Sequence, residues 1–403
     1  MQRIIFVNLH GNEMLVKTLY KYLFKQSVAI KHKYLLDYLL SKNDEYEVCS
    51  FINKNGFSLF KNLPETITKF LNHFRFIEHR IILKANHIPL SKIHILKNVK
   101  EIANNDIILL YRHGVSQYDG MENIKAFKAV SLIHFFGSAD ESETIRNINP
   151  DILFNESDLS TNSRIFNEYY SWFRKEFIVH PFVPAERFKN IKPFAERQNK
   201  CFSTGTITYK THPEFLAVYG DSCDQPARKF VKDNPEFFKN TVDCYSSDYL
   251  EDNPGKQIKE SDCGIVKLYK KVYNRTHIGK QKKYFSFNMV EKFNDYKMHL
   301  VGEEILGVPG IGFVEGMACG SAYIGIDSPM YRDLGLIPGV HYIAYDGTKE
   351  GLKSTVKYYQ KQENQEELAR IAATGCKYVQ EHFNGETAAR DLLEKITQLA
   401  KQR

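Results

Sequence analysis

One segment of the chain combines glycines, small residues and a single acid in an order that suits phosphate chemistry. It runs from Gly310 to Asp327 and reads G-I-G-F-V-E-G-M-A-C-G-S-A-Y-I-G-I-D. The pattern predicts a glycine-rich turn, a short helix that carries Glu315, and a strand over Ala322–Ile326. Glycines let a phosphate approach the backbone, and a carboxylate can accept hydrogen bonds from both hydroxyls of a ribose. The segment therefore indicates nucleotide binding at Gly310, Gly312 and Glu315.

This segment resembles the signature E-G-F-G-x-x-x-x-E-A-M-A-C-G-x-P-V-I-x-S of the GT-B glycosyltransferases, the retaining enzymes that include many of bacterial polysaccharide synthesis. A second stretch, Phe177–Phe188 (F-I-V-H-P-F-V-P-A-E-R-F), resembles their interdomain connector V-I-P-N-G-V-D-x-x-R-F, with departures at His180 and Phe182. The resemblance implies an α/β protein with the GT-B fold. In that fold two Rossmann-like domains face each other across a cleft, and the C-terminal helix crosses back to the N-terminal domain. Glu315 would bind the ribose of a nucleotide sugar.

The chain departs from the family pattern at two positions. The family carries a further Glu, eight residues before the ribose-binding one, that contacts the donor sugar; this chain has Gly307 there, and Glu303 and Glu304 are one turn out of register. The family usually has G-R after the first strand of the second domain, where this chain has Gly205-Thr206. These departures indicate a donor other than the common hexoses.

Phosphate binding is expected in the second domain. Ser203, Thr204 and Gly205 follow its first predicted strand and could donate to a phosphate. The missing cation could come from Arg228 or its neighbour Lys229, or from the cluster that contains Lys282, and would neutralise the charge of the leaving nucleotide. For each of these cations, a solvated surface position is the alternative interpretation.

Candidates for the acceptor side and for catalysis follow the predicted strands of the first domain. Because ligands bind beyond the carboxyl ends of parallel strands, these loops should border the cleft. The resemblance places His134 near the donor sugar, and Glu156 and Asp158 are candidates for a base or a covalent carboxylate. The acceptor-side candidates are His10, Gly11, Arg112 and His113.

The elements that must position these residues follow from hydrophobic patterning. Strands are expected over Arg3–Val7, Tyr46–Ile52, Asp106–Tyr111, Ala129–Phe136, Asp151–Phe154 and Lys200–Thr206. Helices are expected over Glu13–Lys25, Pro226–Lys232, Ile265–Tyr273, Lys349–Gln360, Glu366–Phe383 and Glu386–Lys401. The predicted domains are 1–184 (N-terminal, acceptor side), 185–385 (C-terminal, nucleotide-sugar binding) and 386–403, a helix that packs on the first domain.

Composition excludes several other classes of protein. The chain has 403 residues, of which 43% are hydrophobic and 26% charged, as in ordinary globular proteins of two domains. Its seven cysteines form no C-x-x-C pair, so neither a disulfide framework nor a structural zinc is expected. No D-x-D motif flanked by strand-like residues is present, and we expect no metal and no cofactor beyond the nucleotide-sugar co-substrate. No apolar run reaches the ~18 residues that span a bilayer, and the N-terminus does not resemble a signal peptide.

The net charge of +7 is concentrated in one stretch. Lys61–Lys100 contains eight Lys and Arg residues against two Glu, interleaved with apolar side chains in a mostly helical pattern. Such a surface could contact an anionic membrane, or it could be a solvated face over core helices. A nucleic-acid partner is not expected, because no recognised motif accompanies the charge. We expect a cytoplasmic protein at the inner face of the cytoplasmic membrane.

Taken together, the residues predict a glycosyltransferase that moves a sugar from a nucleotide donor to a growing bacterial surface glycan such as lipopolysaccharide O-antigen or capsule. CMP-Kdo is the specific donor we expect, because a cation-rich site would suit a sugar that carries a carboxylate. Two alternatives stay open: a nucleotide-sugar epimerase of the same fold, and a non-catalytic module that docks a partner at the membrane. Retention or inversion of stereochemistry is not determined by the sequence.

Overall fold

The computed structural model describes residues 1–7, 9, 32–52, 76–77, 79–111, 120–133, 135–248, 262–277 and 287–403. The chain divides into two compact units. Unit one comprises Met1–Val183 and His382–Arg403, and unit two comprises Pro184–Glu381. The predicted helix over Glu13–Lys25 lies outside the described residues.

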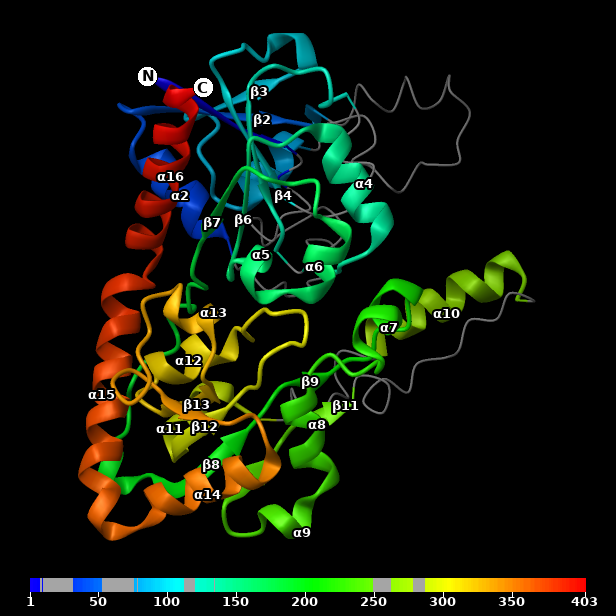
Figure 1. Cartoon of the computed structure of the whole chain (residues 1–403). Helices are drawn as coiled ribbons and strands as arrows, with labels where there is room; N and C mark the ends of the chain where they lie inside the picture. Colours follow the sequence, from blue (N-terminus) through cyan, green and yellow to red (C-terminus); the bar gives the residue numbers. More distant parts are fainter. Residues whose placement is uncertain are drawn as a thin grey trace. The chain divides into compact units, whose positions relative to one another are not determined.

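Unit one is built on a parallel sheet of seven strands in the order β3-β2-β1-β4-β5-β6-β7 (Figure 1). The strands are β1 (Gln2–Val7), β2 (Tyr46–Phe51), β3 (Ile93–Leu96), β4 (Ile107–Tyr111), β5 (Phe127–Ser131), β6 (Ile152–Asn155) and β7 (Glu176–Val179). Its helices include α2 (Lys33–Ser41), α4 (Ala139–Ile148), α5 (Leu159–Asn162), α6 (Arg164–Tyr169) and α16 (Gly385–Gln402). From β1 the next two strands are added on one side, and from β4 onward they are added on the other side. This change of side between β1 and β4 is the arrangement of a Rossmann-like, doubly wound domain.

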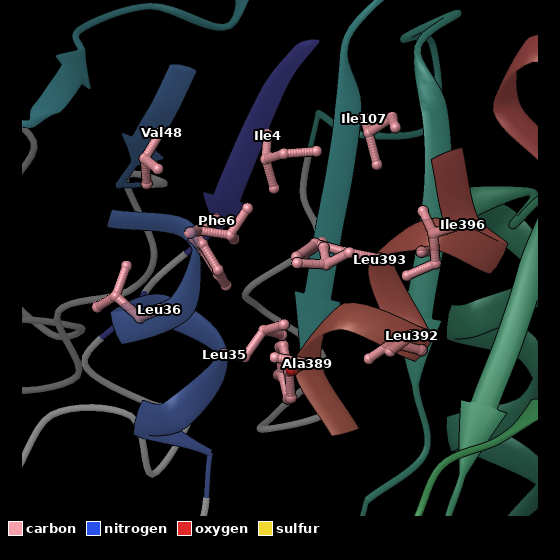
Figure 2. Close-up of a cluster of buried hydrophobic side chains, with 14 of the residues drawn as sticks. Ile4, Phe6, Leu35, Leu36, Val48, Ile107, Ala389, Leu392, Leu393 and Ile396 are labelled. Carbon is pink, nitrogen blue, oxygen red and sulfur yellow. The ribbon is translucent and has the colours of Figure 1, made fainter. Parts of the chain in front are cut away.

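Helix α16 joins unit one although it comes last in the sequence. Asn384 caps its first turn by accepting a hydrogen bond from the Thr387 N–H at 2.9 Å. Its apolar face then packs with α2 on the sheet, and Figure 2 shows Leu393 of α16 near Phe6 of β1. At its start, a Cβ on Gly385 would lie 2.8 Å from Tyr34 Cβ, so glycine permits the close approach of α16 to α2. The crossing back of the C-terminal helix is confirmed.

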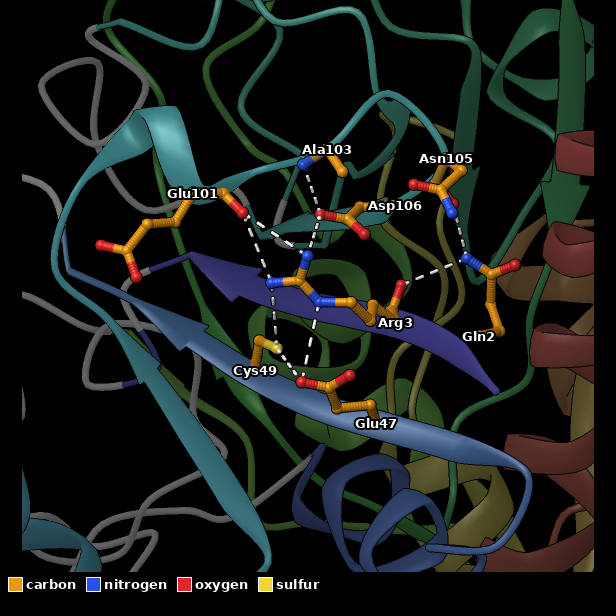
Figure 3. A network of polar contacts seen from close by, with 8 residues as sticks. All are labelled: Gln2, Arg3, Glu47, Cys49, Glu101, Ala103, Asn105 and Asp106. Atoms are coloured by element: carbon orange, nitrogen blue, oxygen red, sulfur yellow. Dashed lines mark hydrogen bonds and ion pairs between the residues drawn. The ribbon is translucent and has the colours of Figure 1, made fainter.

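A polar network holds together the amino-terminal edge of this sheet, at which the strands begin (Figure 3). Arg3 of β1 forms ion pairs with Asp106 (3.1 Å) and with Glu47 of β2 (3.7 Å). Its guanidinium also donates to the Glu101 carbonyl at 3.4 Å. The network ties β1, β2 and the loop before β4 together, at the edge of the sheet where parallel strands do not bind ligands.

Unit two contains a second parallel sheet, with five strands in the order β10-β8-β12-β13-β14. They are β8 (Gln198–Ser203), β10 (Val242–Cys244), β12 (Tyr296–Leu300), β13 (Ala322–Ile326) and β14 (Ile343–Tyr345), and β9 (Thr206–Ile207) pairs with β11 (Ser247–Asp248) beside it. Its α-helices in the described ranges are α7 (Pro213–Tyr219), α8 (Pro226–Asp233), α9 (Pro235–Phe238), α10 (Gly264–His277), α11 (Met289–Asp295), α12 (Gly312–Ala318), α13 (Pro329–Arg332), α14 (Lys349–Gln360) and α15 (Gln365–His382). Strand order reverses between β8 and β12, so a ligand is expected beyond the carboxyl ends of these two strands.

Three predicted segments differ from the structure. The strand expected over Ala129–Phe136 ends at Ser131, whose hydroxyl accepts from the Ile133 N–H at 3.3 Å and so turns the chain out of the sheet. The basic stretch is not helical at Ile93–Leu96, which pairs with β2 as an edge strand. Finally, the expected connector begins as β7, because Glu176–Val179 pairs with β6.

Candidate functional site

The first part of the candidate site is the edge of unit two where β8 and β12 end. Ser203 closes β8 and is fully buried, and the following Thr204 is 2% exposed. The Thr204 N–H donates to the Leu300 carbonyl at 3.1 Å, which joins the ends of β8 and β12. Gly205 then turns the chain with φ +118°, a conformation that L side chains rarely adopt. Sequence reasoning and the structure therefore agree that Ser203, Thr204 and Gly205 lie at the carboxyl edge.

Arg228 reaches this edge from helix α8 and is 7% exposed. Its Nη1 donates to the Thr206 carbonyl at 2.6 Å, and its Nε donates to the Val301 carbonyl beyond β12. Both acceptors are backbone carbonyls, and these bonds fix the orientation of the guanidinium. The neighbouring Lys229 is more exposed and pairs with Asp233 one turn along the helix. Of the two adjacent cations, Arg228 is the one that reaches the carboxyl edge of β8 and β12.

Two glycines make room for the Arg228 guanidinium. A Cβ on Gly205 would lie 2.6 Å from Arg228 Cζ, and a Cβ on Gly310 would lie 2.8 Å from Arg228 Nη2. Real Cβ atoms do not approach other atoms this closely, so a side chain at either position would displace the guanidinium. Gly205 and Gly310 are far apart in the sequence, but both lie against the buried guanidinium of Arg228.

Helix α12 begins two residues after Gly310 and carries Glu315, which is half-buried. Small residues let the helix lie close to β12: a Cβ on Gly316 would lie 2.3 Å from His299 Nε2, and that nitrogen donates to the Phe313 carbonyl at 3.2 Å. Burial lowers the pKa of His299 to about 3, so its ring is neutral in the fold. This packing fixes the backbone of the helix that presents Glu315.

The far end of α12 is held by a second buried arginine. Arg197 is 4% exposed, and its Nη2 donates to the Cys319 carbonyl at 2.8 Å, immediately after the last residue of the helix. The same nitrogen donates to Asn190 Oδ1 at 2.7 Å. Burial lowers the pKa of Arg197. Sequence reasoning did not identify this residue, because no local pattern shows that it reaches a helix end more than a hundred residues later.

Glu303, which lies near the position of the family's missing acid, has a structural role. Its carboxylate accepts hydrogen bonds from the Tyr331 hydroxyl at 2.7 Å and from the Ile326 N–H at 2.9 Å. The Tyr323 hydroxyl donates to the same oxygen at 3.3 Å. Glu303 is 7% exposed, and its bonds fasten the loop after β12 to the end of β13. One Glu303 oxygen thus accepts three hydrogen bonds from within unit two, which stabilise this part of the fold.

In unit one the two candidate carboxylates differ in their surroundings. Glu156 follows β6 and is 3% exposed; burial raises the pKa of Tyr111 at the end of β4, and the Glu156 charge raises it further. Asp158 is the N-cap of α5, and its carboxylate accepts from the Ser160 N–H at 2.9 Å and from the Thr161 hydroxyl at 3.0 Å. The local role of Asp158 is thus clear, whereas Glu156 lies beside a phenol at the carboxyl edge of the sheet.

Next to Glu156 a tyrosine and a histidine are joined across 146 positions of sequence. The Tyr34 hydroxyl is hydrogen-bonded to His180 Nε2. Burial lowers the pKa of His180 to about 3. Burial raises the pKa of Tyr34, and the charge of Glu156 adds to this shift. His180 is one of the departures from the connector pattern, and its contact with Tyr34 supplies a structural reason for that departure.

The remaining candidates lie outside the described residues and stay predictions: His10, Gly11, Arg112, His113, His134 and Lys282. Within the described ranges, no group of three or more His, Cys, Asp or Glu side chains is placed to hold a metal ion. The search for a membrane-spanning helix, over the same ranges, found none of sufficient length and hydropathy.

Comparison with known proteins gives the fold its name. No model of a protein family matches the sequence, and no curated protein matches it significantly. Solved structures do match. The chain is similar to sucrose-phosphate synthase from Thermosynechococcus elongatus (TM-score 0.52, 11% identity, 100% of each chain covered) and to a glycosyltransferase from Rickettsia africae (0.52, 11%, 100% of this chain and 99% of that one). It is also similar to the Anabaena protein HepE in complex with UDP and glucose (0.51, 12%, 99% and 100%).

These neighbours are GT-B proteins, and each is matched over nearly its whole length. At identities of 11–12% the likeness is one of fold. The chain has the GT-B fold with two Rossmann-like units, and the fold class predicted from the sequence is confirmed.

Proposed function

We propose that the protein is a glycosyltransferase that transfers a sugar from a nucleotide-activated donor. The observation that carries this proposal is the buried Arg228 guanidinium, held between the turns of Gly205 and Gly310 at the carboxyl edge of β8 and β12. A fixed cation at the topological switch point of a Rossmann-like sheet suits a phosphate group. The GT-B fold and the UDP bound to HepE support the same function.

The chemistry assigns a role to each group of unit two. During transfer, the bond between the anomeric carbon and the phosphate oxygen breaks, and the oxygen keeps the electron pair. Arg228 would stabilise the charge that develops on this phosphate, which is where preorganised donors contribute most to the rate. The hydroxyls of Ser203 and Thr204 would donate to the phosphate, and Glu315 would accept from the ribose hydroxyls.

Unit one would supply the group that acts on the acceptor hydroxyl or on the anomeric carbon. Of the two candidate carboxylates we propose Glu156, because it is buried beside the Tyr111 phenol after β6, whereas Asp158 is the N-cap of α5. Glu156 would either take the proton that the acceptor hydroxyl loses or form a covalent intermediate. His134 would contact the donor sugar, and the loops of His10, Gly11, Arg112 and His113 would bind the acceptor.

Two donors are proposed for the test. CMP-Kdo is favoured by the absence of the family's first Glu and by the cationic site around Arg228, which suits a sugar with a carboxylate. UDP-glucose is favoured by its presence in a HepE complex. The acceptor we propose is a growing bacterial surface glycan, lipopolysaccharide or capsule, with the protein at the inner face of the cytoplasmic membrane. Lys61–Lys100 would contribute to that contact. The exposed basic residues in the described part of this stretch are Arg80, Lys84, Lys92, Lys97 and Lys100.

A thermal-shift panel of UDP, GDP, CMP and ADP tests the proposal directly. A ligand at a hundred times its dissociation constant stabilises the folded protein by about 2.7 kcal/mol, so one nucleotide should raise the melting temperature clearly. The variant Glu315→Ala should lose most of that shift. The stabilising nucleotide then selects the labelled donor for transfer assays, and nuclear magnetic resonance of the donor incubated alone would reveal an epimerase. If no nucleotide stabilises the protein, the proposal fails and the non-catalytic module is favoured.

A further inference from the structure

A half-buried tyrosine, Tyr245, follows β10 and lies beside the turn that ends β8. Its backbone N–H donates to the Ser203 carbonyl at 2.8 Å. The hydroxyl oxygen of the next residue, Ser246, lies 3.4 Å from that of Ser203. Because β10 pairs with β8 in parallel, Tyr245 lies at the carboxyl edge of the sheet, where the proposed phosphate site also lies.

Three side chains contact the Tyr245 ring and fix its orientation. The ring of Phe202, which is buried in β8, lies 5.3 Å away between centroids, and the ring of Phe287 lies 5.2 Å away at an interplanar angle of 70°. Lys292 Nζ lies 4.9 Å from the Tyr245 ring centroid and donates to its hydroxyl at 3.4 Å. A ring that is already fixed in this way loses little conformational freedom when a flat ligand stacks on it.

Helix α11, which carries Lys292, connects this ring with the rest of the proposed nucleotide site. Its first residue, Met289, lies with Sδ 4.0 Å from Thr204 Oγ1, in the turn after β8. Further along α11, the Phe293 ring lies 5.2 Å from the ring of His299, the buried histidine against which α12 packs. Helix α11 therefore contacts the tyrosine ring, the turn after β8 and the part of β12 that supports the helix of Glu315.

A nucleotide has a phosphate, a ribose and a base, and the proposed function gives residues to the first two. The phosphate is assigned to Arg228 and to the hydroxyls at the end of β8, and the ribose to Glu315. We propose that Tyr245 stacks against the nucleobase, while Phe287 and Lys292 keep its ring in position. Every base has a π face, so this contact adds affinity for the nucleotide without choosing among bases. The assignment rests on the proposed function and extends it to the third part of the ligand.

Calorimetric titration with two ligands tests the stacking. The first ligand is the nucleotide (UDP, GDP, CMP or ADP) that most stabilises the protein in the thermal-shift panel. The second is ribose 5-phosphate, which has the ribose and a phosphate but no base. Tyr245→Leu should raise the dissociation constant of the nucleotide about 5- to 150-fold, which is the range for one base stacked on an aromatic side chain. It should leave the affinity for ribose 5-phosphate unchanged, and Tyr245→Phe, which keeps the ring, should bind the nucleotide like the unmodified protein.

A matched control is Tyr358→Leu, which removes a tyrosine that is 46% exposed from α14 and should bind both ligands normally. Unchanged nucleotide affinity in Tyr245→Leu would overturn the proposal. So would an equal loss of affinity for the two ligands, because the ring would then maintain the shape of the site. A loss in Tyr245→Phe as large as in Tyr245→Leu would overturn it too, because a hydroxyl bond would then carry the contact.

An independent measurement does not depend on the folding of Tyr245→Leu. In the unmodified protein, with only its tyrosines protonated, nuclear Overhauser contacts should join the base protons of the bound nucleotide to a tyrosine ring. These contacts should disappear in Tyr245→Phe, and their absence from the unmodified protein, or their persistence in Tyr245→Phe, would overturn the proposal. If none of the four nucleotides binds the unmodified protein, the proposed function itself fails, and this assignment fails with it.

Discussion

The substitution Arg228→Met should lower both the stability of unit two and its affinity for a nucleotide, and each effect can be measured by itself. Methionine keeps much of the side-chain volume in α8 but removes the charge and every donor. The two hydrogen bonds to the carbonyls of Thr206 and Val301 come from a charged donor, at about 1.5–3 kcal/mol each, so their loss should lower the free energy of unfolding by about 3–6 kcal/mol. A guanidinium bond to a phosphate oxygen contributes about 1.5–3 kcal/mol, so each one lost should raise the nucleotide dissociation constant about 10- to 150-fold.

Isothermal titration calorimetry with the nucleotide selected by the thermal-shift panel measures this change. Lys229→Met is the matched control: it removes a cation from the next position of the same helix, where the side chain pairs with Asp233, and it should bind nucleotide normally. Arg228→Lys should fall between the two, because an ammonium keeps the charge but cannot reproduce the planar fork. If Arg228→Met is folded by circular dichroism and binds the nucleotide as tightly as the unmodified protein, the phosphate role of Arg228 is refuted.

Three further predictions concern other parts of the structure. Glu315→Ala should raise the dissociation constant of the nucleotide tenfold or more in calorimetry while its unfolding curve stays close to that of the wild type; unchanged affinity would contradict the ribose role. Glu303→Gln should do the reverse, costing about 1–3 kcal/mol of stability through its tyrosine contacts without changing nucleotide affinity. His180 and His299, with pKa values of about 3, are neutral in the fold but gain a proton in the unfolded chain below pH ~6.5. Stability should therefore fall as pH decreases from ~6.5 toward 3, by about 1.4 kcal/mol per pH unit for each histidine, and urea unfolding of His180→Gln at pH 7 and pH 5 should show a smaller decrease than the wild type.

Sequence patterns predicted correctly those helices and strands whose determinants all lie within one stretch of the chain. The helix at Gly312–Ala318 and the strand at Ala322–Ile326 follow from glycines, small residues and a β-branched run within one stretch of chain. Edge strand β3 was not predicted because its four residues lie inside a longer stretch of basic and apolar residues whose pattern is mostly helical. The sequence could not choose between Arg228 and Lys229, because tertiary packing alone decides which side of α8 faces the ends of β8 and β12.

The contact between Tyr34 and His180 shows the same limit in unit one. Tyr34 belongs to no motif, His180 departs from the connector pattern, and 146 positions separate the two residues. Each lies at the end of an ordinary element: Tyr34 at the start of α2 and His180 after β7. Only the parallel order of the sheet brings these ends to the edge that also carries Glu156. Sheet topology therefore adds residues to the candidate site that sequence spacing does not reveal.

The two departures from the GT-B signature have structural counterparts. Thr206 stands where the family has an arginine. Arg228 of helix α8 donates to the Thr206 carbonyl, so a cation reaches this turn from another part of the chain. Gly307 stands where the family has its first Glu, and it adopts φ +84° with its N–H bonded to the Glu304 carbonyl at 2.9 Å. A glutamate would be strained in that turn, and nearby Glu303 is engaged by tyrosines. In the function that we propose, Arg228 of α8 supplies the cation for the phosphate, while the chain lacks the acid that contacts the donor sugar in the family. This combination is the physical reason to include CMP in the nucleotide panel.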